Sequence, residues 1–137
     1  MKLSARNQIP GTITNVKEGS VSAIVTLDAS GITVTGTISV AAVRELGLEK
    51  GAAATAVIKA TEVMVGLEKA RLSARNQFPG KITNVHKGNA DAAVTLSVHG
   101  GHTITATISV AAVEELGLEA GMDAVAVIKA TSVMFGV

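Results

Sequence analysis

A nine-residue segment carries the side chains best suited to bind an anion, and it occurs twice in the chain. The first copy reads Leu-Ser-Ala-Arg-Asn-Gln-Ile-Pro-Gly over residues 3–11, and the second, over residues 72–80, differs only in having Phe78 for Ile9. Core strands of a duplicated domain usually keep a hydrophobic pattern and not an identical polar run. The repeat therefore indicates that both copies use these polar side chains for the same task.

The repeated polar groups are those that bind an oxyanion. Arg6 offers a fork of N–H donors, Ser4 lies on the same face of an extended segment, and Asn7 adds an amide. Ser39 is expected at a helix start, where N–H groups and the helix dipole favour an anion, and Lys59 ends an apolar strand. Such a set can offset the desolvation of a dianion. The alternative, ordinary surface charges at strand ends, is disfavoured by the recurrence of the set as Ser73, Arg75, Asn76, Ser109 and Lys129.

Catalysis has less support than binding. A nucleophile needs an activating base, yet His86, His99 and His102 all lie in the second half and have no counterpart in the first. His99 and His102 could bind a metal, but no further ligand is evident. Glu45 and Glu115 recur on the expected solvent face of a short helix. We therefore expect a protein that is not an enzyme.

Composition narrows the class further. The 137 residues are 47% hydrophobic, but they include only two Phe, no Trp, no Tyr and no Cys, and the net charge is +1. A repeat of about 65 residues with so aliphatic a core is marginal alone, so pairing or oligomerisation is expected. Disulfides and thiolate metal sites are excluded. Without phosphate-loop motifs or aromatic platforms, no nucleic-acid partner is expected. We also expect no membrane partner, no signal peptide and a cytoplasmic location.

The chain divides into two domains. The halves align at an offset of 69 up to Gly31 and of 70 after one inserted residue near Gly101. We predict domains at residues 1–66 and 71–137. The linker over residues 67–70 is too short to act as a flexible tether, so the copies should pack together.

Each half has the pattern of five strands and one short helix. Alternating and β-branched runs of the first half predict strands over residues 11–16, 21–27, 32–38, 54–60 and 62–65. Turns are expected at residues 17–20 and 28–31. Ser39 is the expected N-cap of a helix over residues 40–46, and Gly47 follows its end. The predicted fold is mainly all-β, with two tandem five-stranded barrels of the oligonucleotide/oligosaccharide-binding (OB) type, each closed or nearly closed and each carrying one short helix.

The motifs also occur in a characteristic order. Ser-Ala-Arg-Asn-Gln is followed by Gly-x-Ile, Lys-x-Gly, Leu-Gly-Leu-x-x-Gly and a strand ending Val-Ile-Lys-Ala-x-x-Val. This order and spacing resemble the molybdate-binding Mop domain of the TOBE superfamily. Two copies in tandem resemble a di-Mop molbindin, a cytoplasmic molybdate-storage or homeostasis protein. The resemblance covers essentially the whole chain.

The resemblance implies a homotrimer of OB-like barrels that binds molybdate or tungstate as the free oxyanion, without an organic cofactor or a direct protein ligand to the metal. It implies sites between domains of different subunits, where Ser4, Arg6 and Asn7 of one domain face Ser39, Lys59 and the backbone N–H of Ala42 of another. The interface residues carried over by motif are Ser4, Arg6, Asn7, Ser39, Ala42, Lys59, Ala60, Ser73, Arg75, Asn76, Ser109, Ala112, Lys129 and Ala130.

A second class of site, on the threefold axis, is implied for the segment after the first turn. Its residues here are Gly19, Ser20, Val21 and Ser22, and in the second half Gly88, Asn89, Ala90 and Asp91. The family's usual sequence is Gly-Ala-Val-Asn. Ser22 can still donate a hydrogen bond, whereas three ionised copies of Asp91 would repel a dianion. We expect the second axial site to be weak, altered or absent, unless Asp91 turns outward and backbone N–H groups bind the anion alone.

The sequence thus predicts a non-enzymatic protein that binds and stores molybdate, and tungstate too, at subunit and domain interfaces for intracellular molybdenum homeostasis. The alternative is a regulatory or structural interaction module that uses the oxyanion only as an effector.

Overall fold

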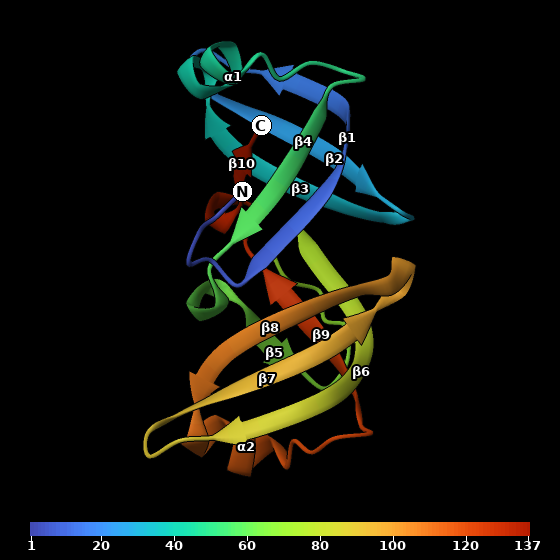
Figure 1. Ribbon diagram of the computed structural model, residues 1–137, viewed down its shortest axis with the longest axis vertical. Coiled ribbons are helices and arrows are strands. Elements are labelled where there is room, and N and C mark those ends of the chain that lie inside the picture. The colour runs from blue at the N-terminus through green and yellow to red at the C-terminus, as the bar shows by residue number, and fades with distance from the viewer.

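The computed structural model describes all residues, 1–137, as two antiparallel five-stranded sheets stacked along the long axis of the molecule (Figure 1). The elements of the first half are β1 (Asn7–Glu18), β2 (Ser22–Ala29), β3 (Ile32–Ser39), α1 (Val40–Leu46), β4 (Ala53–Ile58), the 3₁₀-helix η1 (Ala60–Glu62) and β5 (Met64–Gly66). Those of the second half are β6 (Asn76–Lys87), β7 (Asp91–Val98), the 3₁₀-helix η2 (His99–Gly101), β8 (His102–Ser109), α2 (Val110–Leu116), β9 (Asp123–Ile128), the 3₁₀-helix η3 (Ala130–Ser132) and β10 (Met134–Gly136).

The two halves exchange their fifth strands. The first sheet has the order β10-β4-β1-β2-β3 and the second β5-β9-β6-β7-β8. Phe135 of β10 lies opposite Ala56, and Val65 of β5 lies opposite Ala126. The mainly all-β class with one short helix in each half is confirmed. The expectation that each repeat closes a barrel with its own fifth strand is wrong, because each repeat lends that strand to the other.

The core is aliphatic and follows the alternation of the strands. In β2, for example, Ala23, Val25 and Leu27 are buried, while the residues between them are more exposed. Thirty buried hydrophobic residues from both halves form one continuous cluster, in which Phe78 and Phe135 are the only aromatics. Neither α-helix, at seven residues each, has the length and apolar content needed to cross a bilayer.

The predicted helix and its caps are confirmed. Ser39 is extended, and its Oγ accepts a hydrogen bond from the backbone N–H of Ala42 at 3.0 Å. Gly47 ends the helix with φ of 64°, a left-handed conformation that favours glycine. These signals act within one turn of chain, so the sequence alone places the helix correctly.

Several predicted turn and strand boundaries are wrong, because strand pairing extends into the expected turns. Lys17 and Glu18 pair with β2 and do not belong to a turn. Asp28 and Ala29 pair with β3, which leaves a two-residue turn at residues 30–31. Two further corrections concern the last two predicted strands: the one expected over residues 54–60 ends at Ile58, and the one expected over residues 62–65 covers residues 64–66, after η1.

Candidate anion-binding site

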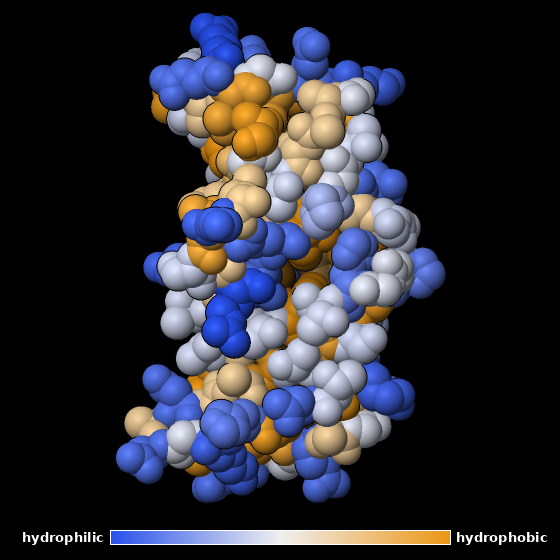
Figure 2. Space-filling model, in the orientation of Figure 1, coloured by the Kyte–Doolittle hydropathy of each residue, from blue (hydrophilic) through white to orange (hydrophobic).

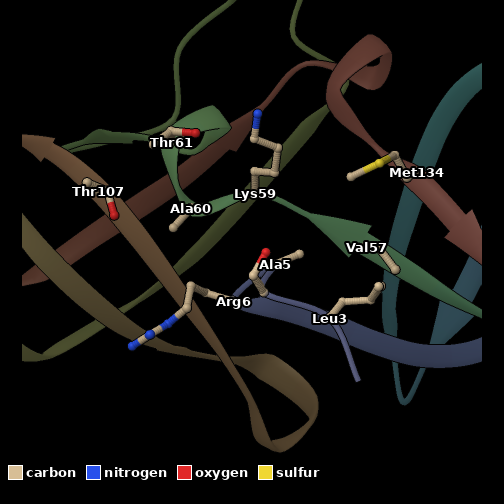
Figure 3. A pocket seen from close by; sticks show the side chains of 10 residues that line it. Leu3, Ala5, Arg6, Val57, Lys59, Ala60, Thr61, Thr107 and Met134 are labelled. Carbon is tan, nitrogen blue, oxygen red and sulfur yellow. The ribbon is translucent and has the colours of Figure 1, made fainter. Parts of the chain in front are cut away.

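A groove of about 460 Å³ opens where the two halves meet, and we call it the junction groove (Figure 3). Its lining includes both cations singled out in the sequence. The lining residues are Leu3, Ser4, Ala5, Arg6, Val57, Lys59, Ala60, Thr61, Thr107 and Met134. Four of the predicted site residues, Ser4, Arg6, Lys59 and Ala60, are thus brought together within one half.

Strand register explains why Arg6 and Lys59 are neighbours. Asn7, the first residue of β1, pairs with Ile58, the last residue of β4. In an antiparallel pair the residue before one strand and the residue after the other leave the sheet at the same end. The second half repeats this register, because Asn76 pairs with Ile128. Its corresponding residues are Ser73, Arg75, Lys129 and Ala130.

The cations of the groove have no carboxylate partners. The ion pairs of the chain are Arg44 with Glu18 and Lys81 with Asp123, so neither Arg6 nor Lys59 is neutralised by a carboxylate within 4.0 Å. Figure 3 shows the Lys59 ammonium and the Arg6 guanidinium pointing in different directions. In the single chain they therefore offer positive charge to the same groove without converging on one point.

The helix start does not belong to the junction groove. Ser39 and Ser109 cap their helices by accepting from Ala42 and Ala112, each at 3.0 Å. The N–H of Ala42, expected to face an anion, is therefore engaged within the chain. Each serine hydroxyl still has a proton to donate. Thr107, which does line the groove, precedes Ser109 by two residues on β8, so the two side chains share one face of that strand.

The predicted amide donors are also engaged within the chain. Nδ2 of Asn7 donates to the carbonyl oxygens of Thr105 at 2.9 Å and Ile58 at 3.2 Å, and its Oδ1 accepts from the N–H of Thr105 at 2.8 Å. Asn76 makes the equivalent bonds to Thr35 and Ile128. Both asparagines are 1% exposed. In this structure these hydrogen bonds connect each half to the other and position the adjacent arginines.

The segments predicted for an axial site form two exposed turns outside the junction groove. In the first, the N–H of Gly19 donates to the carbonyl oxygen of Ser22 at 2.8 Å, and Val21 is 77% exposed. In the second, Gly88 donates to Asp91 in the same way. Asp91 has no cationic partner within 4.0 Å. Ser20, Asn89 and Ala90 complete these turns and are exposed.

Sequence reasoning missed Thr61 and Thr107. Thr107 reaches the groove because η1 packs against β8 of the other half (Figure 1). No local pattern reports this contact, since it depends on the strand exchange. The histidines lie elsewhere: Nε2 of His102 is 2.8 Å from the carbonyl oxygen of Ala29, and no three His, Cys, Asp or Glu side chains gather as a metal-binding group.

Known proteins share both the repeat and the fold. The family model of the TOBE domain matches residues 3–65 and 72–135. The molybdenum transport protein ModE of Herbaspirillum seropedicae is 38% identical over 100% of this chain and 52% of its own length. A probable molybdenum-pterin-binding protein of Haemophilus influenzae is 49% identical over 49% of this chain and 97% of its own length.

A solved structure is similar over the full chain. The cytoplasmic molybdate-binding protein ModG, in a form with molybdate bound, has a TM-score of 0.97 and 40% identity and covers 100% of this chain and 99% of its own. By contrast, the chain spans about half the length of the two ModE relatives, from Herbaspirillum seropedicae and Azotobacter vinelandii.

Proposed function

Because the chain belongs to the TOBE-domain family, we propose that it binds molybdate as the free oxyanion and leaves it chemically unchanged. One observation carries the proposal. In each half, the same strand register places an arginine and a lysine at one end of the sheet, and in the junction groove neither Arg6 nor Lys59 has a carboxylate partner. The fold in which this occurs is that of ModG, which has been solved with molybdate bound.

The chemistry of the groove suits a tetrahedral dianion. Arg6 can donate two parallel hydrogen bonds to two oxygens, Lys59 adds a second positive charge, and Ser4 adds a hydroxyl donor. Charge-assisted bonds of this kind offset the desolvation of the ion. Tungstate has the same shape and charge, so we propose that the same groups bind it. The bound ion would constitute a cytoplasmic store for molybdenum homeostasis.

We further propose that the sites are completed by a homotrimer. In the single chain the side chains of Arg6 and Lys59 diverge, and a neighbouring subunit could supply the missing donors. The start of α1, with the Ser39 hydroxyl and no acidic residue in its first turn, is a suitable contribution. Hydrophobic side chains at the surface support such contacts (Figure 2), and the large ones are Met1, Leu3, Val21, Met64, Leu67, Leu72, Met134 and Val137.

A second candidate is an effector-binding module of a longer protein. It is supported by the two ModE relatives, about half of whose length this chain spans. In that role the chain would bind few ions and respond to them through a covalently attached or separate partner. Full occupancy of the repeated sites favours storage, whereas sparse occupancy together with a protein partner favours the module.

The number of bound ions tests the proposal. The protein is equilibrated with molybdate, free ion is removed, and native mass spectrometry reports the subunits and ions of each complex. We expect Arg6→Ala and Lys59→Ala each to lower the number of ions per oligomer, because each removes a charge from the junction groove. Arg44→Ala and Lys81→Ala are matched controls at exposed ion pairs outside the groove. Unchanged stoichiometry in both groove variants would refute the assignment.

A further inference from the structure

The strand exchange needs an explanation, because an unexchanged arrangement is open to the chain. In the first half only five residues, 59–63, separate β4 from β5. A connection of that length allows β5 to fold back on β4 as a hairpin. Yet β5 pairs with β9 of the other half, and β10 takes the place beside β4. The two fifth strands also occupy equivalent registers, since Phe135 faces Ala56 and Val65 faces Ala126.

One difference between the halves lies at a buried position next to these strands. Gly36 of β3 pairs with Val25, and Ala106 of β8 pairs with Val94, so the two residues are equivalent. A Cβ on Gly36 would lie 2.5 Å from Cε2 and 2.9 Å from Cζ of Phe135. The φ of Gly36 is not positive, so its backbone does not require glycine. Glycine is required instead by the phenyl ring of Phe135, because the ring occupies the space that a Cβ at position 36 would fill.

The second sheet has the opposite balance of sizes. Ala106 is fully buried and carries a methyl group where Gly36 has none. The strand that completes this sheet presents the smaller Val65, and β5 lies beside β8 as β10 lies beside β3. One sheet therefore combines glycine with phenylalanine, and the other combines alanine with valine.

We propose that these two pairs select the strand exchange by size, so that each sheet edge accepts the fifth strand of the opposite half. Without exchange, the Phe135 ring would meet the methyl group of Ala106, and Val65 would leave a gap over Gly36. Overpacking and cavities both destabilise a core. The same rule holds between two copies of the chain: a first-half sheet fits the last strand of a second half and disfavours that of another first half.

The exchange also builds the junction groove. A single residue, Val63, separates η1 from β5, so the movement of β5 to the second sheet brings η1 against β8. Thr107 of β8 thereby joins Lys59 and Ala60 in one lining. The size match thus determines which side chains surround the groove, whatever ligand the groove binds.

Thermal unfolding of the full chain at one fixed concentration tests the match. We expect Gly36→Ala to lower Tm by on the order of 5 °C through overpacking. Phe135→Val also lowers Tm, but the double variant Gly36→Ala/Phe135→Val should lie well above the sum of the two losses, because it recreates the Ala–Val pair. The reciprocal cycle, Val65→Phe with Ala106→Gly, keeps the test decisive if Gly36→Ala does not fold. Strictly additive losses in a measurable cycle would overturn the proposal.

Disulfide trapping reports the exchange itself, since the chain has no cysteine of its own. Thr55→Cys/Gly136→Cys joins paired positions of β4 and β10 and should oxidise to an intramolecular disulfide. Thr55→Cys/Gly66→Cys is the matched control, because Gly66 pairs with Val125 and would face Thr55 only without exchange. In a Val65→Phe/Phe135→Val background we expect the 55–136 crosslink to decline and the 55–66 crosslink to form. Unchanged crosslinks in that background would contradict selection by size.

Discussion

Single residues join the two halves as well as line the groove. Asn7 and Asn76 are buried, and each amide makes three hydrogen bonds, two of them to the backbone of a threonine in the opposite half. No buried side-chain nitrogen or oxygen lacks a partner. The polar run repeated in the sequence therefore serves two purposes: Ser4 and Arg6 of the first copy line the groove, and the asparagines of both copies hold the halves together.

The two asparagines should differ in their contribution to stability. Asn76→Ala leaves the N–H and the carbonyl of Thr35 unpaired, and Thr35 is only 8% exposed. We expect a loss of about 2–3 kcal/mol in the free energy of unfolding, since buried unpaired groups lose their hydration. Asn7→Ala should cost less, because water can reach the half-buried Thr105. Urea denaturation measures both losses, and a larger cost for Asn7→Ala would contradict this account.

A substitution of Asp91 tests the axial site that the family resemblance implies. Its carboxylate is exposed and has no cationic partner, whereas the equivalent Ser22 is neutral. We expect Asp91→Ser to raise the number of molybdate ions per oligomer and Ser22→Asp to lower it. Native mass spectrometry counts the ions, with Asp28→Ser as an exposed control. If Asp91→Ser leaves the count unchanged, the carboxylate does not restrict binding at that turn.

At the scale of elements, the helix and its caps could be predicted from local signals in the sequence, whereas the pairing of the strands could not. The helix over residues 40–46 follows from its Ser39 and Gly47 caps, which act within one turn. The turns expected at residues 17–20 and 28–31 are present but begin later than predicted, because β1, β2 and β3 pair further than local propensity indicates. The exchange was hidden because β5 and β10, Met-Val-Gly and Met-Phe-Gly, have the same pattern.

The candidate site could also be predicted only in part from the sequence. Ser4, Arg6, Lys59 and Ala60 follow from the repeated motif, and the register of β1 with β4 brings Arg6 and Lys59 together. Thr107 does not follow from the motif, because it enters the groove from the opposite half. The engagement of Asn7 by the Thr105 backbone was equally hidden, since it depends on how β1 lies on β8.

The start of α1 allows capping to be separated from anion binding. Ser39→Ala removes the bond to the N–H of Ala42 and should cost about 1 kcal/mol of stability. Ser39→Asp can still cap the helix, but it places a negative charge where we propose a neighbouring subunit to present an anion. We therefore expect Ser39→Asp to keep the thermal stability and reduce molybdate binding measured by calorimetry. Full binding by Ser39→Asp would remove the helix start from the proposed site.

At the scale of the whole molecule, the two halves are mutually dependent although each repeats the other in sequence. Every sheet contains a strand from the far half (Figure 1). The groove likewise takes its lining from both halves. The 3₁₀-helices η1 and η3 also touch, through a 3.0 Å hydrogen bond from Ser132 Oγ to Glu62. Such a molecule should unfold as one cooperative unit.

Loss of the C-terminal strand should therefore damage the first sheet. Deletion of residues 134–137 removes one of the two neighbours of β4 and the ring that covers Gly36. We expect faster hydrogen exchange in β4, while β9 keeps β5 as its neighbour and stays protected. Hydrogen–deuterium exchange with peptide resolution measures both strands, and the intact chain is the reference. A loss confined to β9 would contradict the strand order.

The strand exchange also determines when the first sheet can close during synthesis of the chain. The first half leaves the ribosome first, but β4 has only β1 as a native neighbour until Met134–Gly136 have been translated. Until then the β4 edge lacks its native neighbour, and an unpaired strand edge is an aggregation hazard. The strand that closes the first sheet follows the whole of β6 to β9 in the chain, so the first sheet reaches its native form only after the second half has been made.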